Sequence, residues 1–353
     1  MKLYAAPDLI VFARYLFQAA GCDDDKARII AELLVEADLM GHTTHGLALA
    51  SDYLEEIENS AMLTQGEPRI LSDRGAVSVW DGNRLPGVWL TAKALDLACE
   101  RARSYGVCVV TIRGSHHIAC LSAYLSRATN QGLMVIIASS DPSAASVAPY
   151  GGKKPVFTPD PIAVGIPTGG DPILIDMSAS ITTNGLSARL HREGKRFPGM
   201  WAMDSDGIFT DDPVVIFANP PGSILPTGGM DHGHKGYGLA LLVEALTQGL
   251  GGYGRAEKPS EWGASVFIQV FDPGLFAGLD DFRREVEWTA EACRTNPPVR
   301  ADAKVRLPGE ASLSRRRSAL LHGVHLYPGV VESLESWAEK FSVNLPMPID
   351  NGN

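Results

Sequence analysis

The chain has 353 residues, of which 45% are hydrophobic and 20% charged, and its formal net charge is -10. This length suggests two or three domains, and the balance of residue types is that of a globular protein and excludes a disordered one. Because the only dense basic run is at 315–317, the composition disfavours nucleic acid and anionic membranes as partners.

The cysteines and the N-terminal sequence indicate the cellular compartment in which the protein resides. Five cysteines are spread along the chain without a CxxC pair, and valines surround Cys108. This pattern predicts buried free thiols in a reducing environment. The N-terminal sequence contains no apolar signal core, and no apolar stretch is long enough to span a bilayer. We therefore expect a soluble, cytoplasmic protein.

The N-terminal region is predicted to be helical as far as about residue 70. Asp24 and Asp25 can cap a helix whose apolar residues recur at spacings of three and four as far as Gly41. A second helical pattern covers 49–57. The segment GHTTHG (41–46) joins the two helices.

Strands and helices then alternate along the chain. The expected elements are a strand at 76–80, a helix over 88–105 ended by Gly106, a strand at 107–112, a loop at 113–117, a helix closed by Gly132 and a strand at 133–139. A strand, a helix and a strand in this order indicate an α/β layer with a crossover connection.

The middle of the chain is rich in glycine and proline, for example at 148–155 and 165–172. Such segments are rigid loops that often line a site. Beyond them we predict a buried helix over 234–252, a strand at 264–272, a last helix over roughly 279–295 and an extended arm at 296–310.

Histidines beside glycines are the strongest chemical signal. They form three pairs, His42 with His45, His116 with His117, and His232 with His234. Histidine suits proton transfer near neutral pH, but a structural role is equally open. The spacing matches neither HExxH nor paired CxxC, so no metal site is predicted. The chain also lacks GxGxxG, a phosphate-binding P-loop and GxSxG.

Longer blocks of sequence point to a family. The blocks are GHTTHG (41–46), RGSHHIA (113–119), PYGGKKPVFTPDPIAVGIPT (149–168), PILIDMSAS (172–180), LPTGGMDHGHKGYGLALLVEAL (225–246), FDPGLFAGLDDF (271–282) and VRLPGE (305–310). In this order, over roughly residues 25 to 312, they resemble the malate/L-lactate dehydrogenase family, whose members use a nicotinamide cofactor without the Rossmann fold.

The resemblance implies an α/β fold with a mixed-sheet cofactor domain and a helical domain from both termini. It divides the chain into 1–70, 71–310 and 311–353, the first and last parts packing together. It further implies a homodimer whose active site includes the partner subunit. The implied reaction is reduction of a ketone or imine, of the 2-keto acid or cyclic imino acid kind, with NADH or NADPH.

Site residues follow from the matched positions. His117 and His45 correspond to the acid/base histidines. Substrate contacts are expected from Thr44, Asp141 and Asp160, and from Arg189 as an alternative grip for a carboxylate. The resemblance assigns cofactor contacts to Asp176, Met177, Ser178, His234, Lys235, Arg306, Pro308, Gly309 and Glu310.

The sequence departs from the family at positions that concern the substrate. Leu49 stands where the family usually has an arginine that binds the substrate carboxylate. Leu186 stands where the family usually has a basic or acidic residue, and Asp160 replaces the asparagine of the family's NPIA motif. Leucine cannot replace an arginine fork. A reductase for an unusual substrate therefore remains open, and this substrate either lacks a free carboxylate or is gripped elsewhere by Arg189, Arg192 or Lys154. A non-redox lyase or cyclase step and a zinc-dependent hydrolase using the same histidines also remain open.

Overall fold

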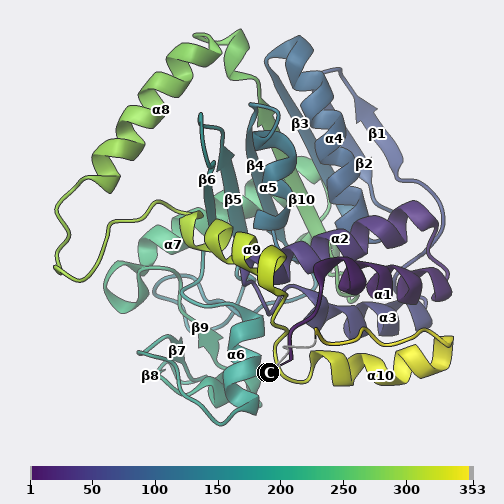
Figure 1. Ribbon diagram of the computed structural model, residues 1–353. Helices are drawn as coiled ribbons and strands as arrows, with labels where there is room; N and C mark the ends of the chain where they lie inside the picture. Colours follow the sequence, from purple (N-terminus) through teal and green to yellow (C-terminus); the bar gives the residue numbers. More distant parts are fainter. Residues whose placement is uncertain (1, 350–353) are drawn as a thin grey trace.

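A mixed, seven-stranded sheet forms the centre of the structure, a computed structural model that describes residues 2–349 (Figure 1). The strand order is β1-β2-β3-β10-β4-β5-β6. The strands are β1 (Arg69–Asp73), β2 (Val77–Asp81), β3 (Val107–Ser115), β4 (Met134–Ser140), β5 (Pro161–Ile166), β6 (Ile173–Ser178) and β10 (Ala264–Phe271).

The sheet combines a local crossover with a long-range insertion. β2 and β3 pair in parallel, and α4 (Gly87–Tyr105) connects them, as the alternation of strand and helix patterns predicts. β10 comes from much later in the chain and pairs antiparallel with both β3 and β4. The sequence contains no signal for this insertion, because each strand pattern is local.

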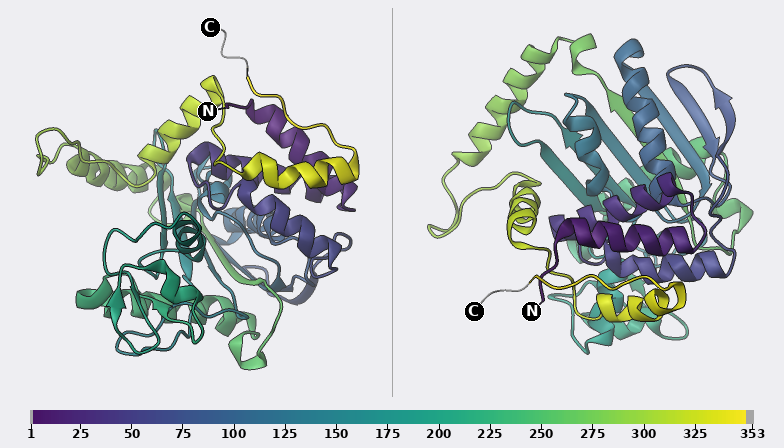
Figure 2. Two further views of the ribbon diagram at one scale, coloured as in Figure 1. Left: turned by 90° about the horizontal axis from the view of Figure 1, so that it is seen from below. Right: turned by 45° about the vertical axis from the view of Figure 1, so that its right-hand side comes forward.

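A helical layer covers one side of the sheet. The helices are α1 (Ala6–Ala19), α2 (Asp24–Met40), α3 (Ala50–Glu58), α5 (Ser122–Thr129), α9 (Glu310–His322) and α10 (Val330–Phe341). α9 packs against α2, and α10 packs against α1 and α3. The backbone N–H of Ile349 donates to the carbonyl oxygen of Leu3 at 2.7 Å, so the first and last described residues lie side by side (Figure 2).

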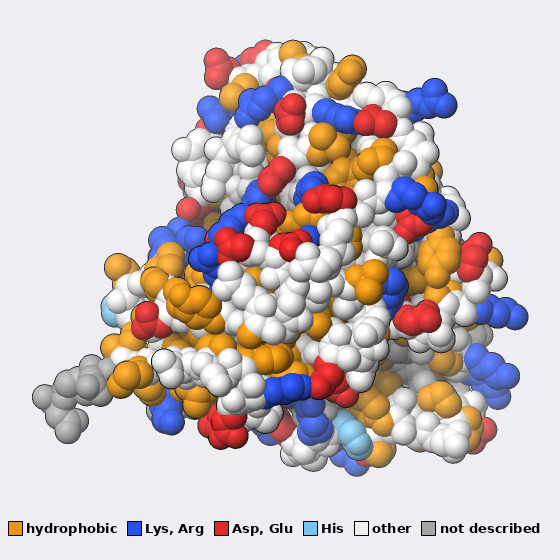
Figure 3. All heavy atoms as spheres, turned by 90° about the vertical axis from the view of Figure 1, so that its right-hand side faces the viewer, with side chains coloured by type: hydrophobic (Ala, Val, Ile, Leu, Met, Phe, Trp, Pro, Cys, Tyr) orange, Lys and Arg blue, Asp and Glu red, His pale blue; other side chains and the backbone are white. Residues whose placement is uncertain are grey.

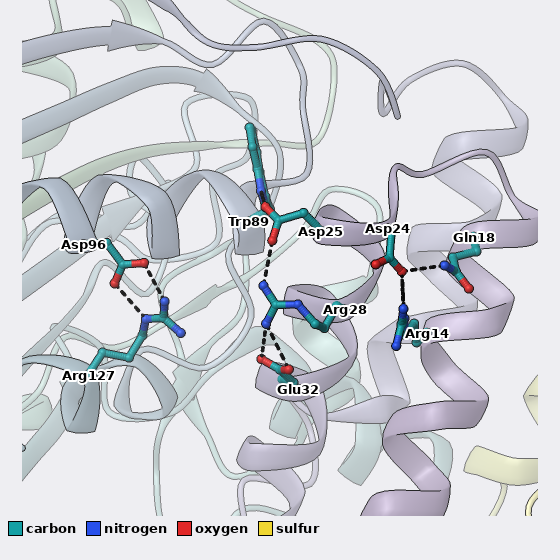
Figure 4. Close-up of polar contacts among 9 residues, drawn as sticks. All are labelled: Arg14, Gln18, Asp24, Asp25, Arg28, Glu32, Trp89, Asp96 and Arg127. Atoms are coloured by element: carbon teal, nitrogen blue, oxygen red, sulfur yellow. Dashed lines mark hydrogen bonds and ion pairs between the residues drawn. The ribbon is translucent and has the colours of Figure 1, made fainter.

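Ion pairs and hydrogen bonds join the helices of this layer to one another and to α4 (Figure 4). Asp24 accepts from Arg14 of α1 at 2.5 Å, and Asp25 accepts from the indole N–H of Trp89 in α4 at 2.8 Å. Helix α2 begins at Asp24 as predicted, but Asp24 and Asp25 both lie in its first turn, and Asp23 is the residue that precedes it. Their role is therefore to contact neighbouring helices rather than to cap their own.

Charged side chains of both signs are interspersed on the face that carries β1 and α4 (Figure 3). Arg69 pairs with Asp81 at 3.0 Å, and Lys93 with Glu67 at 2.5 Å. Exposed pairs of this kind contribute little to stability, about 0–1 kcal/mol each. This face thus presents no continuous field of one sign.

Residues 184–244 and 279–294 form elements outside the central sheet and the helical layer. These elements include α6 (Asn184–Arg192), α7 (Gly229–Glu244), α8 (Leu279–Arg294) and a small sheet of β7 (Ala202–Met203), β8 (Phe209–Thr210) and β9 (Ser223–Ile224). α8 and the extended arm after it project from the sheet (Figure 1). Within residues 2–349, no helix has both the length and the apolar character needed to cross a membrane.

Several predictions about elements are confirmed and others are wrong. The helices at 24–40 and 88–105, the strands at 107–112 and 264–272 and the extended arm are present. The predicted buried helix over 234–252 begins at Gly229, continues after Glu244 as a π-helix over Ala245–Gly249, and leaves Leu241 and Leu242 exposed. β5 lies in a region predicted as loops, and two helices follow the predicted last one.

Four of the five cysteines are buried, and none of them is in a disulfide. Cys293, on α8, is the exposed one. The prediction of buried free thiols is confirmed for Cys108, whose burial raises the pKa of its thiol. A protonated thiol is a poor nucleophile, so Cys108 serves as a packing residue.

Candidate active site

A cavity of about 750 Å³ opens where the loop at 41–46, the loop after β3, the end of β6 and the start of α6 meet. This volume is in the usual range for small-molecule sites. Of the residues assigned from the sequence, those that line it are Thr44, His45, His117, Asp141, Asp176, Met177 and Ser178. Leu49 and Leu186, the two departures from the family pattern, line it too.

The GHTTHG segment is held by close packing at its two glycines. Gly41 ends α2 with a φ of 86°, a left-handed conformation that favours glycine. A side chain at Gly46 would lie 2.3 Å from the carboxyl carbon of Asp38, which accepts from the backbone N–H of Leu47 at 2.7 Å. Burial raises the pKa of Asp38 to about 7. These contacts fix the loop that carries Thr44 and His45.

His117 lies in a rigid, largely aromatic setting. Its Nδ1 accepts from the backbone N–H of Ala119 at 3.3 Å and lies 2.8 Å from the hydroxyl of Tyr53. Its ring stacks on Trp262 with centroids 4.8 Å apart and planes 29° apart. Because Nδ1 acts as an acceptor, the neutral ring carries its proton on Nε2.

Burial holds the pKa of His117 well below its usual value, and the neighbouring His45 and His116 lower it further. Burial also lowers the pKa of His45, whose Nδ1 lies 2.7 Å from the hydroxyl of Thr44. The ring centroids of His45 and His117 are 6.2 Å apart. The two predicted acid/base histidines therefore lie side by side, both neutral, in one cavity wall.

His116, behind His117, is fully buried. Its Nε2 lies 3.1 Å from a carboxylate oxygen of Glu56, and its ring meets Trp262 edge-on at 4.9 Å. Burial lowers the pKa of His116 to about 3, with a smaller contribution from Arg84. This residue braces Trp262 and does not line the cavity.

Asp176 joins the cavity to a polar cluster. Its carboxylate accepts from the backbone N–H of Ser122 at 3.0 Å, and the Ser122 hydroxyl lies 3.1 Å from His42 Nε2. Cys120 Sγ lies 3.9 Å from the same carboxylate. Ligand atoms of His42, Cys120 and Asp176 all lie within 4.8 Å of one another and could hold a metal ion. No spacing in the sequence indicated this group.

Asp141 and Asp160, the two acidic residues predicted to contact the substrate, differ in their position relative to the cavity. Asp141 lines the cavity, and its carboxylate accepts from the backbone N–H of Ser143 at 2.9 Å. Asp160 is fully buried and does not line it. Its carboxyl accepts from the hydroxyl of Thr158 at 2.7 Å, and burial, together with the charge of Glu244, raises its pKa well above the usual range.

Arg189, the remaining substrate residue predicted from the sequence, lies outside the cavity lining. Its guanidinium donates to the hydroxyl and the carbonyl oxygen of Thr43 at 3.0 and 2.9 Å. It also lies 3.6 Å from the ring centre of Tyr327. With its donors used in this way, Arg189 holds the loop that bears Thr44 and His45.

The residues assigned to the cofactor occupy two places. Met177 and Ser178 lie at the cavity end of β6, where the hydroxyl of Thr227 donates to the carbonyl oxygen of Ser178 at 3.0 Å. A side chain at Gly236 would lie 2.5 Å from the carbonyl oxygen of Ala179. The start of α7, with His234 and Lys235 exposed, is thereby packed against the turn after β6.

The arm residues lie at the other end of β6. Pro308 accepts from the backbone N–H of Leu174 at 3.1 Å, and Gly309, with a φ of 92°, would clash with Leu174 if it carried a side chain. Glu310 accepts from Arg294 at 2.7 Å, and Arg306 is exposed. The structure therefore does not bring the arm into the cavity.

Sequence reasoning missed Tyr53 and Trp262, which fix His117, and Cys120 and Ser122 beside Asp176. Tyr53 lies one helical turn after Leu49, so a shared face was the one signal available. Trp262 lies in a loop before β10, and no local pattern connects it with His117.

Comparisons with known proteins identify relatives of this chain. A family model for malate/L-lactate dehydrogenase matches residues 4–335. The L-lactate dehydrogenase of Cupriavidus necator is 29% identical over 95% of this chain and 96% of its own. The Delta(1)-pyrroline-2-carboxylate/Delta(1)-piperideine-2-carboxylate reductase of Pseudomonas syringae pv. tomato is 30% identical over 94% and 95%.

Solved structures share the fold. The delta1-piperideine-2-carboxylate reductase of Pseudomonas syringae superposes with a TM-score of 0.83 at 28% identity, covering 96% of this chain and 100% of its own. The malate dehydrogenase of Entamoeba histolytica superposes with a TM-score of 0.92 at 24% identity, covering 98% and 99%.

Proposed function

Because the chain belongs to the malate/L-lactate dehydrogenase family, whose matched relatives are dehydrogenases and reductases, we propose that it is a nicotinamide-dependent reductase. Its substrate is a small molecule with a ketone or an imine, which is converted to the alcohol or the amine. The observation that carries the proposal is the placement of His117 and His45 side by side in a cavity whose rim holds Met177 and Ser178.

The residues around the cavity fit a nicotinamide cofactor. The hydroxyl of Thr182 lines the cavity and is buried without a hydrogen-bond partner, so it is available to a ligand. Met177 and Ser178 would hold the nicotinamide half. His234 and Lys235, exposed at the start of α7, would hold phosphate, because helix N-termini and lysine both favour anions. NADH and NADPH are both compatible with these residues.

When bound, the reduced nicotinamide supplies a hydride to the carbonyl or imine carbon. Among residues 2–349 no side chain or backbone group accepts from the Nε2–H of His117, so this group can donate to the substrate oxygen or nitrogen. As negative charge grows on that atom, it favours the protonated imidazole and offsets the burial that keeps the ring neutral. The ring takes up a second proton from solvent, gives one proton to the reduced atom and returns to its neutral form.

Other residues keep His117 in place during this transfer. Tyr53 and the backbone N–H of Ala119 fix the ring from one edge, and Trp262 supports its face. Such preorganisation lowers the barrier because little reorientation is needed at the moment of reaction. His45, positioned by Thr44, orients the substrate or takes the second acid/base role.

We further propose that two copies form a homodimer in the cytoplasm. Leu241 and Leu242 of α7 and Trp288 of α8 are 47%, 50% and 72% exposed in the single chain, which is typical of side chains that a partner covers. Residues 1–70 and 311–353 would form one helical part beside a catalytic part at 71–310, with residues 1 and 350–353 outside the described structure. Sedimentation of Leu241→Asp should show a shift towards monomer, and an unchanged dimer would exclude this face.

Titration of the purified protein with NADH and NADPH, followed by fluorescence and heat, tests the reductase proposal. Binding of either one in the micromolar range would support it and would identify the cofactor. A folded protein that binds neither would contradict it and would direct attention to a non-redox step.

A further inference from the structure

The charges that line the cavity are of one sign. Among the described residues, the lining contains the carboxyl groups of Asp52, Asp141 and Asp176 and no lysine or arginine. Burial lowers the pKa values of the lining histidines His45 and His117 and raises those of Asp52 and Asp141. The described residues of the lining therefore supply no permanent positive charge that could pair with a bound carboxylate.

Two arginines near the cavity, Arg189 and Arg255, are engaged elsewhere. Arg189 donates to Thr43 and stacks on Tyr327. Arg255 donates twice to a carboxylate oxygen of Glu244, at 3.0 and 2.7 Å. Moving either guanidinium into the cavity would leave a partly buried partner without its hydrogen bonds, at a cost of about 1–3 kcal/mol. Neither is a ready anchor for an anion.

Much of the remaining lining is apolar or aromatic, beside several hydroxyl groups. Trp201, Phe217 and Trp262 present rings, and Leu49 and Leu186 present aliphatic side chains. Aromatic faces attract cations, tryptophan most strongly, and they also pack against apolar bodies. A carboxylate placed among these groups would lose its hydration without gaining a charged partner.

We propose that this cavity selects a substrate that lacks a carboxylate and carries a basic nitrogen, such as a cyclic imine or an amino ketone. The inference rests on the proposed reductase function and deepens it. Such a substrate differs from those in the names of the relatives, which are carboxylates such as malate, L-lactate and Delta(1)-pyrroline-2-carboxylate.

A cyclic imine would enter the cavity as its iminium ion and be reduced there by hydride transfer. The hydride and its electron pair form a new C–H bond at the ring carbon, the C=N π bond breaks, and its electron pair moves to nitrogen. The iminium is reduced to a neutral amine, and the nicotinamide is oxidised to its cation. Asp176 lines the cavity beside Met177 and Ser178, and its carboxylate is the group that would pair with the cationic nitrogen.

A matched pair of compounds tests the proposal. The probes are 1-pyrroline and 1-piperideine against the same rings carrying a 2-carboxylate, with the nicotinamide that the protein binds. We expect kcat/KM to favour the carboxylate-free rings by about tenfold or more, since a carboxylate near one uncompensated acidic group loses about this much. A preference for the carboxylate-bearing rings would overturn the inference.

Leu49→Arg provides the gain-of-function arm. Leu49 is half-buried in the cavity wall, so an arginine there can reach a bound carboxylate, and the preference should shift towards the 2-carboxylates by about 10- to 100-fold. Leu320→Arg, on the exposed face of α9, adds the same charge outside the cavity and should leave the preference as it is. Equal shifts in both variants would overturn the local explanation.

Failure of this inference is distinguishable from failure of the proposed function. If the protein binds no nicotinamide, the reductase proposal fails, and binding of the same rings is measured by calorimetry. Tighter binding of the carboxylate-free rings would still support the selectivity of the cavity. Equal or reversed affinities would overturn it whether or not the protein reduces either ring.

Discussion

Replacing Asp160 with asparagine should make the protein less sensitive to rising pH. Asp160 is fully buried, and its carboxyl accepts from Thr158 at 2.7 Å. Burial, followed by the charge of Glu244, raises its pKa well above the usual range. At neutral pH the folded protein therefore keeps this carboxyl protonated, which makes it similar in shape and hydrogen bonding to an asparagine amide.

The sign of the effect follows from linkage. The unfolded chain releases the Asp160 proton near the ordinary carboxyl pKa of about 4, whereas the folded protein retains it. Stability contributed by this residue is present below that pH and falls as the pH rises towards the raised pKa. With one proton of difference, the loss is about 1.4 kcal/mol per pH unit. Asparagine has no such dependence.

Urea denaturation of the wild type and Asp160→Asn at pH 5 and pH 6.5, at one protein concentration, measures this difference. The variant should gain about 2 kcal/mol over the wild type between the two pH values. Asp302→Asn is the control, because Asp302 is exposed and its pKa is lowered by Arg300, so it stays ionised in this window. Parallel curves for wild type and Asp160→Asn would refute a protonated Asp160.

Three further outcomes are expected. His117→Ala should reduce turnover by about 10²- to 10⁴-fold, as measured by steady-state kinetics, and leave the affinity for the nicotinamide nearly unchanged; full turnover would remove His117 from the acid/base role. Arg189→Met should lower the free energy of unfolding by about 1–3 kcal/mol through its two lost hydrogen bonds, and an unchanged urea midpoint would contradict this. Gly236→Ala should destabilise by at least about 1–3 kcal/mol, because its methyl group would lie 2.4 Å from the backbone nitrogen of Thr227, whereas Gly170→Ala, with no atom within 4 Å, should change the melting temperature little.

The sequence predicts elements whose signal is local. Helix α2 and strand β3 have apolar patterns of the right period, and a glycine follows α2 in the left-handed conformation. Strand β5 was missed because its glycine- and proline-rich surroundings indicate loops, although Pro161 is tolerated as the first residue of a strand. The position of β10 between β3 and β4 could not be predicted, since pairing partners far apart in the chain have no common local pattern.

The same limit applies to the site. His117 and His45 could be proposed because glycine-flanked histidines resemble family blocks, and the structure brings both into one cavity. The residues that determine their ring orientation and charge state, Tyr53 and Trp262, come from other elements and become visible only in the fold. α7 was predicted to be buried because its sequence is apolar, but an apolar helix face can equally be one that a second copy covers.

The charge of the cavity links the proposed homodimer to the proposed selectivity. A second copy could supply the cation that the lining of this chain lacks, and a carboxylate substrate would then be preferred by the dimer alone. The preference measured above and below the dimer dissociation concentration separates the two cases. A carboxylate-free preference at both concentrations assigns selectivity to the cavity's own acidic and aromatic residues. A carboxylate preference that disappears on dilution assigns it to the partner subunit and contradicts the inference from Asp52, Asp141 and Asp176.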